Sequence, residues 1–191
     1  MRIIAGSAKG RKLLSVSTKL FIKPISGRMK QSLFDILKPR IMGSYFLDLF
    51  AGTGAVGMEA LSRGALKACF VEKDRRCVDV IERNVDRFGF RDKAVVLRAD
   101  ARQPLSWVPV RSGVESFDLV FLGPPYRDEE HRPLAYTSPV LENIAKAELL
   151  APTGWVIAQH HIKEPVRAPA GLKDFRHAKY GDTVISFFSR A

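Results

Sequence analysis

The sequence has little cysteine, no long hydrophobic run and almost no acidic side chains in its first forty residues. Cys69 and Cys77 are its two cysteines, with no CxxC spacing and no nearby pair of histidines. This scarcity disfavours a disulfide framework or a zinc site and favours two reduced, partly buried thiols, so we expect no metal. The apolar runs fall far short of the roughly 20 residues that cross a bilayer. The basic N-terminus also lacks the apolar stretch of a signal peptide. We therefore expect a cytoplasmic, non-membrane protein.

The scarcity of acid is local. The chain of 191 residues carries a net charge of +11. Its first forty residues hold ten basic side chains against Asp35 alone, which is +9, so the other 151 residues carry +2. Clustered Lys and Arg displace counterions from a phosphate backbone, so this segment indicates a polyanion-binding element. A merely solvated basic segment is the alternative that charge alone leaves open.

Hydrophobic periodicity predicts a single α/β unit, and with 46% apolar residues the chain can bury a full core. A helix containing Met29, Leu33, Phe34 and Leu37 is expected after Ser26 and before Pro39. The predicted strands are 2–5, 11–16, 45–49, 68–72, 94–98, 117–122 and 155–159, and the further helices lie near 54–62, 75–88 and 135–149. Alternating strands and helices favour a parallel sheet covered on both faces, and residues 175–188 read as a closing hairpin.

The strongest local pattern is a buried strand that runs into glycines with GxGxxG spacing at Gly52, Gly54 and Gly57. Glycines at such a turn let the backbone approach a ligand, and the helix that follows presents free N–H groups. The spacing alone serves dinucleotide sites and S-adenosylmethionine (SAM) sites. Sometimes it marks only a tight turn.

Three acids end three successive predicted strands and favour SAM. Asp48 near the end of the first would repel a pyrophosphate but attract the ammonium of a methionine moiety. Glu72 ends the second, where a carboxylate can accept both ribose hydroxyls. Asp100 ends the third and could accept from an adenine amine. Each acid alone could be a helix cap or a solvated carboxylate, but the three together make that reading much weaker.

A rigid turn follows the next buried strand, at Gly123, Pro124, Pro125 and Tyr126. Consecutive prolines cannot extend the sheet, and their carbonyls are left without competing N–H partners. Tyr126 would then lie at the carboxyl edge of the sheet, where a planar base could stack. The alternative is a turn that simply ends a strand.

Taken together, these motifs resemble class I SAM-dependent methyltransferases that act on exocyclic amines of bases. More closely, the chain resembles the RsmD family of 16S ribosomal RNA guanine-N2 methyltransferases, and the similarity covers essentially its whole length. The segments that carry this resemblance are Met1–Gly6, Lys9–Leu13, Lys23-Pro24, Arg28, Leu33-Phe34, Leu47–Gly64, Glu72, Asp100, Gly123–Tyr126 and Tyr180–Thr183.

The resemblance implies a Rossmann-like, seven-stranded, mostly parallel sheet with an antiparallel last strand, preceded by a basic hairpin and helix. It implies a basic RNA-binding extension over residues 1–40 and a SAM-dependent methyltransferase domain over 41–191, acting as a monomer on 16S rRNA or a small-subunit assembly intermediate. The expected SAM contacts are Asp48, Ala51, Gly52, Thr53, Gly54, Glu72, Lys73, Asp100 and Ala101. The expected catalytic turn is Gly123, Pro124, Pro125 and Tyr126, and the expected RNA contacts are Arg2, Lys9, Arg11, Lys12, Lys23 and Arg28.

One position departs from the family pattern. Gly123 stands where the family usually has Asp, so the side-chain acceptor for the amine is missing. The backbone carbonyls of Gly123 and Pro124 could suffice, or Asp128, Glu129 or Glu130 could substitute. A weakly active or noncatalytic RNA-binding or ribosome-assembly factor that keeps the SAM site is the third reading. A DNA amine methyltransferase also stays open, whereas Asp48 disfavours a nicotinamide-dependent enzyme.

Overall fold

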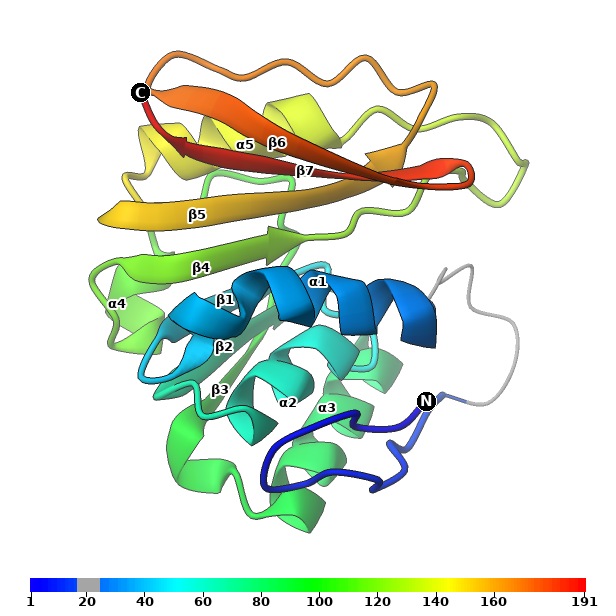
Figure 1. Cartoon of the computed structure of the whole chain (residues 1–191), viewed down its shortest axis with the longest axis vertical. Coiled ribbons are helices and arrows are strands. Elements are labelled where there is room, and N and C mark those ends of the chain that lie inside the picture. Colours follow the sequence, from blue (N-terminus) through cyan, green and yellow to red (C-terminus); the bar gives the residue numbers. More distant parts are fainter. Residues whose placement is uncertain (17–24) are drawn as a thin grey trace.

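A computed structural model describes residues 1–16 and 25–191 of the chain. Seven strands form one sheet in the order β3-β2-β1-β4-β5-β7-β6 (Figure 1). The strands are β1 (Tyr45–Leu49), β2 (Lys67–Glu72), β3 (Ala94–Arg98), β4 (Phe117–Leu122), β5 (Leu150–His161), β6 (Leu172–Tyr180) and β7 (Thr183–Arg190). The first five strands pair in parallel, and β7 runs antiparallel to both of its neighbours, β5 and β6. The predicted sheet with an antiparallel last strand is therefore confirmed.

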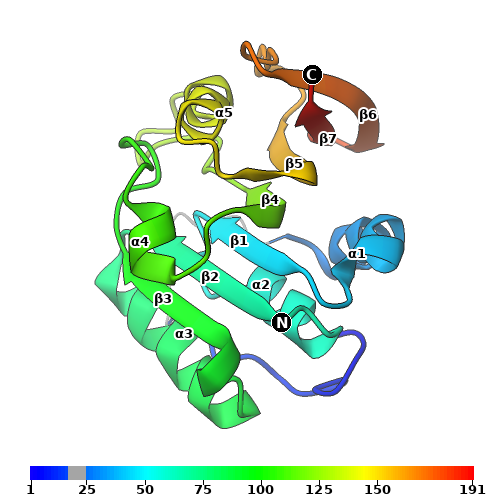
Figure 2. The ribbon, with the colours of Figure 1, turned by 90° about the vertical axis from the view of Figure 1, so that its left-hand side faces the viewer.

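Helices cover both faces of the sheet because each presents an apolar side to it (Figure 2). One face carries α1 (Gly27–Ile41), α2 (Ala55–Ser62) and α3 (Arg75–Phe88), and the other carries α4 (Val108–Ser112) and α5 (Thr137–Lys146). A short 3-10 turn, Arg91–Lys93, precedes β3. Because every crossover returns the chain to the same end of the sheet, the carboxyl ends of β1 to β5 share one edge.

Several sequence-based expectations differ from the structure. Helix α1 passes through Pro39 and ends at Ile41, because a proline in the last turn removes only one hydrogen bond and Ile41 is buried in the core. The segments 2–5 and 11–16 are not full strands; the predicted N-terminal hairpin is a short antiparallel pairing, with one bridge between Arg2 and Lys12 flanked by hydrogen bonds from Ile3 N–H to the Arg11 carbonyl and from Leu13 N–H to the Met1 carbonyl, both at 3.0 Å. Sequence reasoning also shortened β5 and missed α4.

Backbone partners outside the segment explain why the hairpin pairing ends after Ile3. The N–H groups of Ile4 and Ala5 donate to the Glu59 carboxylate at 2.9 and 3.0 Å rather than to a neighbouring strand. Glu59 is fully buried in α2 and also pairs with Lys30 of α1, with 2.8 Å between Nζ and Oε2 and both side chains 0% exposed. A buried carboxylate with these partners joins the N-terminal segment to two helices. The described part of residues 1–40 thus shares its core with the sheet.

No helix among residues 1–16 and 25–191 is long and apolar enough to span a membrane. Over the same residues, no three His, Cys, Asp or Glu side chains are grouped as metal ligands would be. Cys69 and Cys77 are buried free thiols, and burial raises the pKa of each to about 12, which keeps both protonated.

Candidate functional site

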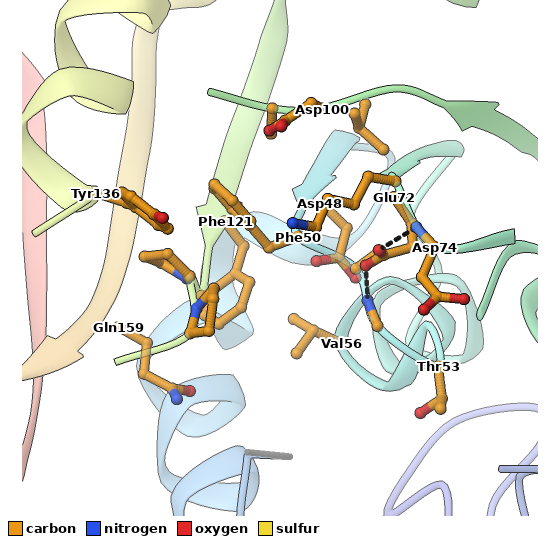
Figure 3. Close-up of a pocket in the computed structure, with 18 of the residues that line it drawn as sticks. Asp48, Phe50, Thr53, Val56, Glu72, Asp74, Asp100, Phe121, Tyr136 and Gln159 are labelled. Atoms are coloured by element: carbon orange, nitrogen blue, oxygen red, sulfur yellow. Dashed lines mark hydrogen bonds between the residues drawn. The ribbon is translucent and has the colours of Figure 1, made fainter. Parts of the chain in front are cut away.

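A cavity of about 360 Å³ lies at the carboxyl edge of the sheet, where the loops after β1, β2, β3 and β4 meet. Eleven of the predicted cofactor and catalytic residues line it: Asp48, Ala51, Gly52, Thr53, Glu72, Lys73, Asp100, Ala101, Gly123, Pro124 and Pro125. Figure 3 shows Asp48, Glu72 and Thr53 on one side and Tyr136 and Gln159 on the other, with Phe121 between them. The fold therefore brings together predicted residues that are up to 77 positions apart in the chain, from Asp48 to Pro125.

The glycine loop has the conformation that its composition suggests. Gly52 and Gly54 have φ angles of 56° and 78°, which favour glycine, and Phe50 also lies at φ 59°, a strained value for an aromatic residue. A Cβ on Gly57 would lie 2.3 Å from Cε1 of Phe70, so this third glycine is required for α2 to pack on the sheet. Gly54 shapes the turn without lining the cavity, whereas Phe50 lines it and was not predicted.

Asp48 is 1% exposed, and its Oδ2 accepts the N–H of Gly57 at 2.9 Å. Burial raises the pKa of this carboxyl to about 7; the Gly57 hydrogen bond opposes the shift and the nearby charge of Glu72 adds to it. A buried acid that titrates near neutrality is suited to a cationic ligand, because a positive charge beside it favours the ionised form.

Glu72 holds the loop from β2. One oxygen accepts the N–H of Gly52 at 2.8 Å and the other accepts the N–H of Asp74 at 2.9 Å, which are the dashed lines of Figure 3. Each carboxylate oxygen can accept a second hydrogen bond, so Glu72 can still receive the two hydroxyls of a ribose.

Asp100 is held by a neighbour that the sequence reasoning did not single out. The Arg102 guanidinium donates to both of its oxygens at 2.9 Å and lowers the pKa of the carboxyl, keeping it ionised. Arg102 also lies over the ring of Tyr136, 5.0 Å from its centroid, and Tyr136 lines the cavity. An adenine amine could donate to this fixed carboxylate.

The residues fit SAM on three grounds. The cavity volume is within the usual range for small-molecule and cofactor sites. Three carboxylates from the ends of successive strands line the cavity, and SAM carries the groups that such carboxylates can bind: a sulfonium, an ammonium and two ribose hydroxyls. The loop between β1 and α2 supplies backbone that approaches closely because two of its glycines have positive φ. SAM is the cofactor that this donor set suits.

The Pro-Pro turn borders the same cavity, but Tyr126 is placed differently from the expectation. Its side chain is 8% exposed and does not line the cavity; its hydroxyl accepts from Nε2 of Gln159 at 2.9 Å and donates to Oγ1 of Thr183 at 3.4 Å. The ring contacts His161 edge-on, with centroids 5.9 Å apart. Tyr126 thus anchors the Pro-Pro turn to β5 and β7.

The acids that could have replaced a side chain at position 123 are already engaged or exposed. Asp128 pairs with Arg132 at 2.6 Å and accepts two backbone N–H groups, and Glu130 pairs with the same arginine. Glu129 borders the cavity but is exposed. Gln159, which no motif highlighted, lines the cavity beside the turn. Its signal in the sequence was a polar residue near the end of an apolar strand, as for Asp48 and Glu72.

All five predicted RNA contacts among the described residues are exposed, but two of them also bond to the backbone. Lys9, Lys12 and Arg28 are exposed. Arg2 donates to the carbonyl of Gly10 at 2.8 Å, and Arg11 lies over the Phe88 ring and donates to the carbonyl of Arg87. Lys23 lies outside the described residues. Ile25 lines the cavity, and Arg28 lies just after it in the sequence, in the first turn of α1.

His160 and His161 are the last two residues of β5. His160 is buried, and its Nε2 lies 2.8 Å from the hydroxyl of Ser186, which is also 2.9 Å from Nδ1 of His177. Burial lowers the pKa of His160, which favours its neutral form. This group joins β5, β6 and β7 and does not line the cavity.

Comparisons with known proteins agree with the site. The model of the family described as Conserved hypothetical protein 95 matches residues 1–189. The Bacillus subtilis protein named "Putative rRNA methyltransferase YlbH" is 32% identical over 193 residues, covering 100% of this chain and 99% of that one. "Ribosomal RNA small subunit methyltransferase D" of Haemophilus influenzae is 36% identical over 127 residues, which is 66% of this chain and 64% of its own length.

Solved structures match over nearly the full chain. Escherichia coli YhhF superposes with a TM-score of 0.78 at 26% identity, covering 100% of this chain and 97% of that one. A hypothetical protein of Thermus thermophilus gives a TM-score of 0.77 at 28% identity and covers 100% and 99%.

Proposed function

The chain belongs to the RsmD family of rRNA methyltransferases, and from that premise we propose that it methylates the exocyclic N2 amine of a guanine in 16S rRNA, using SAM. The observation that carries this proposal is one cavity lined by three strand-end carboxylates and a Pro-Pro turn. The names of the relatives, which specify rRNA or its small subunit, support the choice of substrate.

The residues divide the work between cofactor and base. Asp48, Glu72 and Asp100 hold the cationic cofactor from three strands, and Thr53 closes the loop beside them. SAM, when bound, supplies an electrophilic methyl group on a sulfonium. The Pro-Pro turn and Tyr136 border the other half of the cavity, where a flipped base could enter at a cost of a few kcal/mol, offset by stacking and edge contacts. Holding amine and methyl in line removes much of the entropic barrier.

Mapping of methylated guanines in 16S rRNA by mass spectrometry tests the proposal. Cells that lack the protein should lose one N2-methylguanine, and wild-type protein should restore it. Asp48→Asn, which removes the acid facing the cofactor, should restore it only in part. An unchanged methylation pattern in cells without the protein would refute the enzymatic role.

Gly123 favours one alternative, an assembly factor without catalysis, because the usual side-chain acceptor is absent. The same cells separate the two functions. The noncatalytic function predicts that small-subunit assembly fails without the protein and that Asp48→Asn restores assembly fully. It also predicts that no methylguanine in 16S rRNA depends on the wild-type protein. Purified protein assayed on matched RNA and DNA strands distinguishes the DNA enzyme.

We also propose that the basic N-terminal segment grips RNA through its exposed cations. Replacing Lys9, Lys12 and Arg28 by Gln should weaken RNA binding and lower the slope of log K against log salt by about 2 to 3, because each phosphate contact releases a counterion. The affinity for SAM should stay within twofold. The matched control replaces Arg111, Lys146 and Lys173, which are exposed and lie on α4, α5 and β6, whereas Lys9 and Lys12 lie beside α2 and α3 on the other face of the sheet. Equal loss of RNA binding in both triple variants would refute a localised grip.

A further inference from the structure

One buried polar atom of the cavity has no hydrogen-bond partner. Among the described residues, three buried side chains carry such an atom: Arg63 at Nη2, Thr137 at Oγ1 and Gln159 at Oε1. Of these three, only Gln159 lines the cavity (Figure 3), and this residue is 4% exposed. Leaving a buried amide oxygen unpaired costs free energy, so native structures rarely keep one without a ligand or function.

The other end of this amide explains its orientation. Nε2 of Gln159 donates to the Tyr126 hydroxyl at 2.9 Å, and that hydroxyl donates onward to Oγ1 of Thr183 at 3.4 Å. The donor end is therefore anchored in the fold. The acceptor end remains for a donor that enters the cavity.

Strand register places Gln159 beside Gly123, the position of the expected catalytic turn that departs from the family pattern. Leu122 pairs with Ala158 in the parallel β4–β5 ladder, so Gly123 and Gln159 are the next positions along the two strands. Side chains alternate across a sheet, so both positions face the same side as Phe121 and its partner Ile157. Gly123 offers no side chain there, and the amide of Gln159 projects from the adjacent strand.

We propose that Oε1 of Gln159 accepts a hydrogen bond from the exocyclic amine of the target base and thereby supplies the acceptor that Gly123 lacks. This inference rests on the proposed function. The amide orients the amine by accepting one N–H while the nitrogen lone pair faces the methyl group. The new N–CH₃ bond forms as the S–CH₃ bond breaks, the sulfonium becomes a neutral thioether, and the nitrogen releases its proton to water, since a neutral amide takes none.

The test compares an RNA fragment carrying the mapped target guanosine with the same fragment carrying inosine, which lacks the amine. Wild-type protein should bind the guanosine fragment at least fivefold more tightly, because inosine leaves Oε1 unpaired. Gln159→Met, which keeps the length but not the acceptor, should abolish this preference and lower kcat/KM about tenfold, with SAM affinity within twofold. Gln159→Glu keeps an acceptor and should retain both the preference and, within about threefold, the rate.

Two controls separate recognition from support of the fold. Thr183→Val removes the far partner of the Tyr126 hydroxyl but leaves Oε1 in place, so the guanosine preference should persist. Gly123→Asp should raise the rate less than threefold, because its Cβ would lie 3.2 Å from Cε1 of Phe121 and Gln159 already supplies the acceptor. A tenfold gain would instead show that the missing carboxylate limits the rate.

Undiminished guanosine preference in Gln159→Met, with an active wild-type protein, would overturn this inference alone. Absence of RNA methylation by wild-type protein would overturn the proposed function and the inference together.

Discussion

Replacing Asp48 by Asn should stabilise the cofactor-free protein and weaken cofactor binding. The pKa of Asp48 is raised from 3.8 to about 7 in the folded protein because burial disfavours its charge. A folded pKa above the unfolded value means that the unfolded chain ionises first, so stability falls as the pH rises from 3.8 through 7. Asn can still accept the Gly57 N–H through its amide oxygen but never pays for burying a charge.

The magnitude follows from the two pKa values. At about 1.4 kcal/mol per pKa unit, the acid costs roughly 2 kcal/mol at pH 5.5 and roughly 4 kcal/mol at pH 8.5. Urea unfolding of wild-type and Asp48→Asn protein at both pH values should therefore show the advantage of the variant growing by about 2 kcal/mol. SAM affinity at pH 8.5 should fall about tenfold in the variant, because an amide cannot neutralise the ligand's cation.

Glu115→Gln is the matched control, since it removes a carboxylate at an exposed position of the chain. Its stability should follow the wild-type pH profile. Parallel profiles for wild-type and Asp48→Asn protein would refute the reasoning, because they would show that Asp48 is ionised at the same pH in the folded and unfolded states.

Two further predictions concern the attachment of the N-terminal segment, both measured by urea unfolding. Gly6→Ala should destabilise the protein by roughly 2 kcal/mol more than Gly10→Ala, because both have positive φ but only the Cβ at position 6 would meet a backbone atom, the Ser62 oxygen at 1.7 Å. Equal losses would show that the close approach is not kept in solution. Glu59→Gln should cost about 3 to 5 kcal/mol by leaving the Lys30 ammonium buried without its counter-charge, and adding Lys30→Met should recover part of that loss, because it removes the unpaired ammonium while the new amide oxygen still accepts a backbone N–H. A double variant no more stable than the single one would contradict this account.

Local patterns carried most of the architecture. Five parallel strands were predicted because buried β-strands read as continuous apolar runs, as in 119–122. Eleven of the expected site residues line one cavity, since strand ends in a parallel sheet share an edge. The errors arose where distant groups bind the backbone: Glu59 accepts the N–H groups of Ile4 and Ala5, where the pairing of the N-terminal segment ends.

Tyr126 and Gln159 show, within the site, the same difference between what local sequence patterns predict and what the tertiary structure decides. The sequence identified the rigid turn but not the direction of its tyrosine, which Gln159 and Thr183 hold away from the cavity. Gln159 follows a strand without any motif, and its importance depends on its place beside Gly123 in the ladder and on its unpaired oxygen.

The sequence by itself determined which residue types end each strand, where the backbone must turn at glycine or proline, and how charge divides between the basic first forty residues and the rest of the chain. Those properties are local, because hydrophobic period, φ preference and charge belong to the residues themselves. Only the tertiary structure decided that Asp48 loses its solvent, that Glu59 anchors the N-terminal segment, and that Gln159 faces the space left by Gly123. Burial, partner and register depend on residues brought together from distant parts of the chain.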